Sequence, residues 1–143
     1  MANYFTQFSC LLPVGSAANL DAALAIYHAY AVERAEAEEP LGLVAEAYPS
    51  HNKPDDNKVW LHADDGEPDD VLEYAFRCAE TLGLSGLWGF CWSLTCSRPL
   101  LDGYGGGAHL IDLATHQTIA WIDLEHWLAE QARADHRRSQ ADS

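Results

Sequence analysis

The sequence predicts a single α+β domain, and three observations lead to this prediction. Short segments with the alternating apolar pattern of strands occur before, between and after two segments with apolar residues at helical spacing. Glycine and proline lie at the ends of most of these segments. The 143 residues are enough to bury one core. We therefore expect one domain over residues 1–138 and a frayed tail at 139–143.

The N-terminal third predicts a strand followed by a helix. Residues 4–12 are rich in strand-forming side chains, and Pro13 and Gly15 end that segment. Ser16 or Asn19 can cap the helix, which we expect to fade near Glu33. Its apolar positions recur at helical spacing and are Leu20, Leu24, Tyr27 and Ala31.

Two strands and a second helix follow. Residues 41–48 and 58–63 read as strands of a hairpin, joined by a polar loop over residues 49–57. Pro68 suits the first position of the second helix, and Gly83 suits a left-handed C-terminal cap. The buried stripe of this helix is expected to contain Val71, Ala75, Cys78, Ala79 and Leu82.

The last third adds a strand, a hairpin and a helix. Residues 87–95 form the strand, which completes the order βαββαβ of the ferredoxin-like fold, with an antiparallel sheet. Residues 108–113 and 118–122 predict a C-terminal β-hairpin, in whose turn His116 could take a positive φ. Asp123 can cap a final helix. Residues 96–107 are expected to form a long loop, with glycines at 103 and 105–107.

Negative charge is concentrated in the middle of the chain. Residues 33–80 contain fourteen acidic side chains and four basic ones, within a chain whose net charge is −14. Such a field repels nucleic acid and anionic membranes and attracts basic protein surfaces. A solvated surface that only keeps the protein soluble is the alternative. The partner we expect is therefore a basic protein surface, with no direct contact to nucleic acid or membrane.

Some of these acidic residues are expected at the C-terminal end of a helix, where negative charge is unfavourable. Glu36, Glu38 and Glu39 follow the first predicted helix, where they meet the negative end of its dipole. Asp65, Asp69 and Glu73 have the spacing of one helix face. The residues predicted to bind the partner are Glu36, Glu38, Glu39, Asp64, Asp65, Glu67, Asp69, Asp70 and Glu73.

The chain contains no established catalytic or metal-binding motif. The spacing of Cys91, Cys96, His109 and His116 is near that of a zinc finger, but the interval between the two histidines is too long. The two cysteines also point to opposite faces of one strand. The glycine run lacks the following lysine of a phosphate-binding loop. We expect no metal and no cofactor. A small enzyme using residues 96–109 remains an alternative, with loop candidates Arg98, Asp102, Tyr104 and His109.

The first ten residues, the length of the apolar runs and the cysteines together indicate the cellular compartment. The first ten residues lack the basic and apolar regions of a signal peptide, and no apolar run reaches the ~20 residues of a membrane span. Four cysteines lie in apolar segments and are expected to be buried thiols. We therefore expect a cytoplasmic protein. The sequence leaves open whether two subunits pair through the exposed edge of the sheet.

Residues 96–99 with Asp102, then residues 105–113 and Trp121, resemble small acidic proteins of phages and bacterial mobile elements. This resemblance implies an inhibitor of host defence, of the anti-CRISPR or anti-restriction kind, and it implies no catalytic residues. Strong nucleic-acid mimics are more uniformly acidic than this chain. An immunity protein against a basic toxin is the second interpretation.

Overall fold

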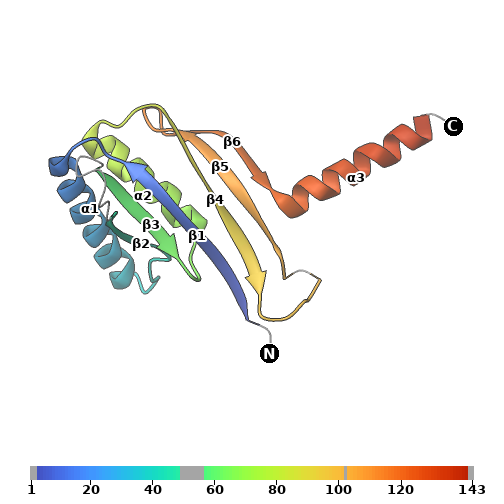
Figure 1. Ribbon diagram of the computed structural model, residues 1–143, viewed down its shortest axis with the longest axis horizontal. Coiled ribbons are helices and arrows are strands. Elements are labelled where there is room, and N and C mark those ends of the chain that lie inside the picture. The colour runs from blue at the N-terminus through green and yellow to red at the C-terminus, as the bar shows by residue number, and fades with distance from the viewer. Residues whose placement is uncertain (1–2, 49–56, 102, 142–143) are drawn as a thin grey trace.

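The computed structural model describes residues 3–48, 57–101 and 103–141 and has an α+β fold, as predicted (Figure 1). One antiparallel sheet contains six strands in the order β2-β3-β1-β4-β5-β6. The elements in chain order are β1 (Tyr4–Pro13), α1 (Ala17–Glu36), β2 (Val44–Ala47), β3 (Lys58–Ala63), α2 (Pro68–Leu82), β4 (Leu87–Cys96), β5 (Gly105–Asp112), β6 (Gln117–Asp123) and α3 (Leu124–Ala141).

Helices α1 and α2 lie side by side on one face of the sheet (Figure 1). Strand β1 pairs with β3 on one side and, through residues 4–7 only, with β4 on the other. The hairpin of β5 and β6 continues the same sheet beyond β4. The predicted pairing of β2 with β3 is confirmed, although β2 is shorter than expected, and the connecting residues 49–56 lie outside the described part of the chain.

The start of α1 and both ends of α2 follow their local signals. The hydroxyl of Ser16 accepts a hydrogen bond from the backbone N–H of Asn19, so Ser16 is the N-cap of α1. Pro68 begins α2, and Gly83 ends it with φ of 66°. Helix α1 continues to Glu36, three residues beyond the expected end.

The core lies between the two helices and the sheet. The ring of Tyr74 is fully buried, and its hydroxyl donates to the carbonyl of Ala23, which ties α2 to α1. Phe8 of β1 packs edge-on against Phe90 of β4, with 6.3 Å between ring centroids. The predicted stripe of α2 is confirmed at Val71, Ala75, Cys78 and Ala79, which are buried, with Leu82 partly buried.

The prediction of a loop over residues 96–107 is wrong at Gly105, Gly106 and Gly107, which belong to β5, whereas Gly103 lies before the strand. A Cβ atom on Gly107 would collide with the ring of Trp92 and with the carbonyl of Ile122. Gly106 has φ of 147° and lies against the carbonyl of Trp92. The glycines therefore allow the close approach of β4 and β5, which sequence spacing alone does not reveal.

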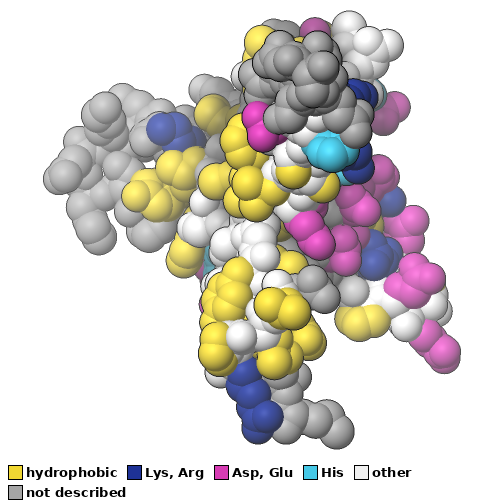
Figure 2. Space-filling model, turned by 90° about the vertical axis from the view of Figure 1, so that its right-hand side faces the viewer, with side chains coloured by type: hydrophobic (Ala, Val, Ile, Leu, Met, Phe, Trp, Pro, Cys, Tyr) yellow, Lys and Arg dark blue, Asp and Glu magenta, His cyan; other side chains and the backbone are white. Residues whose placement is uncertain are grey.

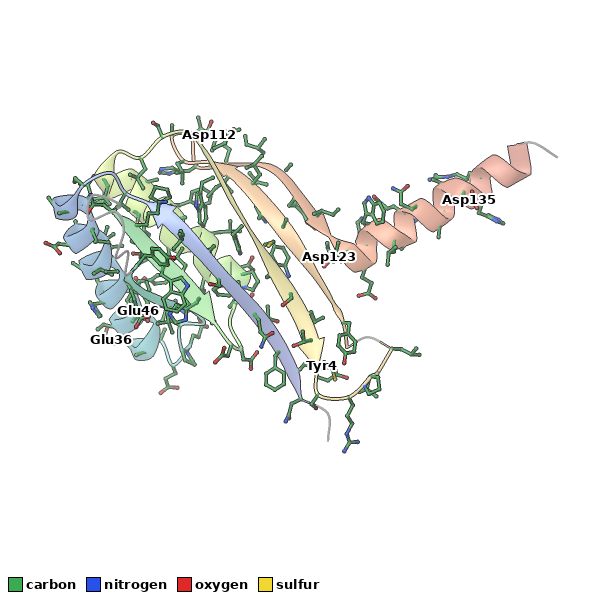
Figure 3. All side chains as sticks on the ribbon, in the orientation of Figure 1. Tyr4, Glu36, Glu46, Asp112, Asp123 and Asp135 are labelled. Carbon is green, nitrogen blue, oxygen red and sulfur yellow. The ribbon has the colours of Figure 1, made fainter. Side chains whose placement is uncertain are left out.

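Helix α3 projects away from the rest of the molecule (Figure 1). The carboxylate of Asp123 accepts from the backbone N–H of His126, which confirms Asp123 as its cap. Figure 3 shows Asp123 at the start of this helix and Asp135 along it. Leu124, Trp127 and Leu128 of α3 are all exposed. The helix reaches Ala141, beyond the expected boundary at residue 138.

The four cysteines are free thiols, and the prediction that all are buried is wrong for one. Cys78 and Cys96 are buried, Cys10 is partly buried and Cys91 is exposed. Cys91 alternates with the core residues Phe90 and Trp92 along β4, so it lies on the face of the sheet that no helix covers.

Candidate functional site

The C-terminal end of α1 and the N-terminal end of α2 meet at one acidic surface. The backbone N–H of Glu67 donates to the carbonyl of Gly42 at 2.8 Å, which holds the segment after α1 against the start of α2. In Figure 2, the acidic side chains gather along one side of the molecule. Eight exposed carboxylates define what we call the acidic face: Glu36, Glu38, Glu39, Asp64, Asp65, Glu67, Asp69 and Glu73.

Asp70 does not belong to the acidic face, which corrects its predicted role. Its side chain is only 4% exposed and accepts hydrogen bonds from Arg34, from the Tyr30 hydroxyl and from the backbone N–H of Gly42. The hydrogen bond to Asp70 raises the pKa of Arg34. Asp70 is thus a buried, fully partnered anion that joins α1 to α2.

The predicted stripe of three carboxylates on one helix is also wrong. Asp65 precedes α2, which begins at Pro68, and its carboxylate lies 3.4 Å from the backbone N–H of Thr6. Only Asp69 and Glu73 share the helix. Pro68, predicted as the first helical position, starts the helix three residues after Asp65, so the predicted helix start already conflicted with the spacing of the stripe.

Glu38 has a backbone conformation that glutamate rarely adopts. Its φ is 59°, and its N–H donates to the carbonyl of Ala35 while the N–H of Glu39 donates to that of Arg34. These two bonds form a Schellman motif, whose left-handed position is normally glycine. Helix α2 has Gly83 in the equivalent left-handed conformation. The chain therefore has a charged glutamate where glycine would be more stable.

Arg77 neutralises part of the neighbouring surface. Its guanidinium donates to Glu33 at 2.7 Å and to Glu73 at 3.0 Å, and it stacks over the ring of Tyr30. The hydrogen bond from Arg77 lowers the pKa of Glu33. Glu73 is thus partly compensated, whereas no ion pair to Glu36, Glu38, Asp69 or Glu67 is found within the described residues.

A cavity of about 270 Å³ lies at the border of the acidic face. Glu67 and Asp69 of α2 line one side, Trp92 of β4 and His109 of β5 line the sheet side, and Asp123 closes it. Burial lowers the pKa of His109, and the nearby carboxylate of Asp69 acts against this shift. The sequence did not connect His109 with the acidic residues, because forty positions separate it from Asp69.

The other loop candidates do not join His109. His109 pairs with Phe90, and six residues of β4, about 20 Å of strand, separate this level from Cys96. Arg98 is exposed beyond that end. The Tyr104 hydroxyl donates to the carbonyl of Cys96, and Asp102 lies outside the described residues. Within the described part of the chain, no three His, Cys, Asp or Glu side chains form a group that could hold a metal ion.

A second polar cluster lies on the face of the sheet that α1 and α2 leave uncovered. Trp60 stacks on His62 with 3.8 Å between ring centroids and donates from its indole N–H to the hydroxyl of Ser9. His62 in turn lies 2.9 Å from the carboxylate of Glu46. The alternation of residues 58–63 could have placed Trp60 and His62 on one face, but it could not identify Glu46 or Ser9 as their partners.

No protein-family model, curated protein or solved structure matches this chain. None of the helices in the described residues combines the length and the apolar character that crossing a membrane requires. The acidic face therefore has to be interpreted from its own chemistry.

Proposed function

We propose that the protein is an inhibitor that binds, through the acidic face, a basic surface of a nucleic-acid-handling defence complex and blocks the access of nucleic acid. The carboxylates of the face resemble a phosphate backbone in charge, and a groove rich in arginine and lysine binds either. The proposal places the protein in the cytoplasm, where such complexes act.

One observation carries this proposal: the glutamate at position 38. Its left-handed conformation costs about 1–2 kcal/mol for a residue with a Cβ atom, and its charge at the C-terminal end of a helix costs up to ~1 kcal/mol more. Local choices that act against stability tend to occur at functional sites. A charge that served only solubility could be placed at many positions without this cost.

Exposure of the face is the second support. All eight of its carboxylates are exposed, although Asp70 between them is buried. Figure 3 shows Glu36 at the end of α1. The ends of two helices thus present charges that the partner could reach without rearrangement of the core.

Affinity capture tests the proposal. The tagged protein, the variant Glu36→Lys/Glu38→Lys/Asp69→Lys and the control Asp21→Lys/Glu80→Lys/Glu125→Lys are incubated with nuclease-treated bacterial lysate at low and raised salt. The control changes the net charge by the same amount at exposed carboxylates outside the face. We expect a nucleic-acid-binding complex to be retained by the wild type and the control at low salt and lost from the face variant.

Equal retention of the complex by the face variant would contradict the proposal. If a basic toxin is captured instead, the same face belongs to an immunity protein. A purified complex then provides the direct test, in which the wild-type protein, but not the face variant, prevents the complex from binding its DNA or RNA.

We also infer that residues 4–96 form a ferredoxin-like unit, to which β5, β6 and α3 are added. Two features support this inference. The elements of this segment follow the order βαββαβ, and α1 and α2 both cover one face of an antiparallel sheet in which β1 lies between β3 and β4.

A further inference from the structure

Strand β6 ends the sheet without the usual protection of an edge. It pairs with β5 on one side and is the last strand in the sheet order. Its residues 117–122 contain no charged side chain and no proline, the two features that most often prevent edge strands from pairing with another chain. Ile119 and Trp121 on this strand are 51% and 59% exposed.

Helix α3 extends past this same edge. It begins directly after β6 and projects outward on the side of the sheet where β6 lies (Figure 1). Leu124, Trp127 and Leu128 occupy one stripe of its first two turns and are 45%, 45% and 62% exposed. A helix with an apolar stripe gains most of its stability by packing that stripe against another surface.

We propose that the protein forms a symmetric dimer in which two β6 strands pair antiparallel and each α3 packs across the sheet of the partner. Antiparallel pairing of identical edges has two-fold symmetry, so one surface serves both copies. The pairing would place the neighbouring copy on the side toward which α3 projects.

The dimensions of α3 suit this arrangement. Its 18 residues span about 27 Å, and neighbouring strands are about 4.8 Å apart, so the helix can cross several strands of the partner. The strands of the partner nearest to the paired edge, β6, β5 and β4, hold an open apolar cavity of about 480 Å³. This cavity lies on the sheet face away from α1 and α2. Its floor is formed mainly by small and apolar side chains, those of Cys91, Ala108, Leu110, Ala120 and Ile122.

The cavity and the helix are complementary in shape and polarity. Gly89, Ala108 and Ala120 leave room above the strands, and Trp127 of the partner is large enough to fill part of that space. Burial of one tryptophan and two leucines in each copy would supply the apolar core that a stable interface requires.

The local charge of the outer half of α3 suits a second copy of this acidic chain. Three of the eight basic residues of the chain, Arg133, Arg137 and Arg138, belong to α3, whereas the net charge of the whole chain is −14. Among the described side chains, Arg133 and Arg137 outnumber Asp135 in the outer half of α3, so this part of the helix would carry a net positive charge toward the acidic partner copy. The pairing strand itself is uncharged up to Asp123, so the two edges meet without repulsion between like charges.

Sedimentation equilibrium of the full chain tests the proposal. The chain mass is 15.8 kDa, and we expect a species of twice that mass. The variant Trp127→Glu/Leu128→Glu should weaken association at least tenfold. Val32→Glu is the matched control, since Val32 is a 57% exposed apolar residue on α1 and should leave association unchanged. A monomeric wild type would overturn the proposal. A dimer that Trp127→Glu/Leu128→Glu does not weaken would also overturn it.

Disulfide trapping tests the strand pairing separately from the helix. Single cysteines replace Thr118, Ala120 or Ile122 in a Cys91→Ser background, and the chains are oxidised and run on a non-reducing gel. At least one of these positions should give a covalent dimer, because residues near a two-fold axis face their own copies. Val32→Cys in the same background should stay monomeric, and failure of all three β6 positions would refute the pairing.

Discussion

The carboxylate of Asp70 accepts a hydrogen bond from the guanidinium of Arg34 at 2.5 Å, across the contact between α2 and α1. Arg34 is also bound to the carbonyl of Glu39, so the pair fixes the segment that follows α1. This ion pair lies directly beneath the acidic face. The arrangement of the exposed carboxylates therefore depends on a buried one.

Loss of Asp70 should destabilise the protein strongly. Asp70→Ala leaves the guanidinium of Arg34 and the N–H of Gly42 without their partner, and we expect a loss of about 3–5 kcal/mol in the free energy of unfolding. Urea denaturation measures it. Asp69→Ala, at the exposed neighbouring position, should change stability by no more than about 0.5 kcal/mol. Similar effects of the two substitutions would contradict the role of Asp70.

Glu38→Gly should stabilise the protein. Glycine adopts the left-handed conformation without the steric cost, and the substitution removes a negative charge from the C-terminal end of α1. We expect a gain of about 1 kcal/mol in the free energy of unfolding. Glu36→Gly, at the last helical position, should instead lose about 0.5–1 kcal/mol. If Glu38→Gly destabilises the protein, the conformation of Glu38 is not strained.

Two neighbouring glycines should respond differently to alanine. Gly107→Ala places a Cβ atom against Trp92 and Ile122, and we expect a loss of about 1–3 kcal/mol or more. Gly105 has only ordinary contacts near 4 Å, from Leu94, so Gly105→Ala should be close to neutral. Thermal unfolding distinguishes them, and equal melting temperatures would show that β4 and β5 do not approach closely at Gly107.

The thiols should differ in reactivity. Burial raises the pKa of Cys78 to about 11, and burial with the nearby Cys91 raises that of Cys10 to about 12, while Cys91 itself is exposed. Alkylation near neutral pH, followed by mass spectrometry, should therefore label Cys91 first. Labelling of Cys78 as fast as Cys91 in the native protein would contradict the burial.

The free energy of unfolding should decrease in alkaline solution, because burial raises the pKa values of Cys10 and Cys78. The folded pKa values of Cys10 and Cys78 lie above those of the unfolded chain, about 8.5, so the unfolded state loses protons first as the pH rises. Their contribution is complete below about pH 8.5 and is lost as the pH rises from there toward the folded values. Cys10→Ala should make the decline less steep, as measured by urea denaturation between pH 7 and 10.

Local signals in the sequence determined most of the secondary structure. The alternation of residues 87–95, the cap at Asp123, Pro68 at the start of α2, Gly83 at its end and the positive φ of His116 each depend on a few adjacent residues. Steric and hydrogen-bonding preferences over such short distances act before any tertiary contact forms, so they can be identified from the sequence alone.

Tertiary structure decided which of these residues meet. Asp70 is buried because Arg34, thirty-six positions earlier, reaches it, and a carboxylate without that partner would lie in water. Gly107 belongs to a strand because the ring of Trp92 occupies the space of a side chain. His109 borders the acidic face, and α3 stands apart with its apolar stripe exposed. These outcomes depend on packing between segments that are distant in the chain. Such contacts cannot be predicted from local sequence.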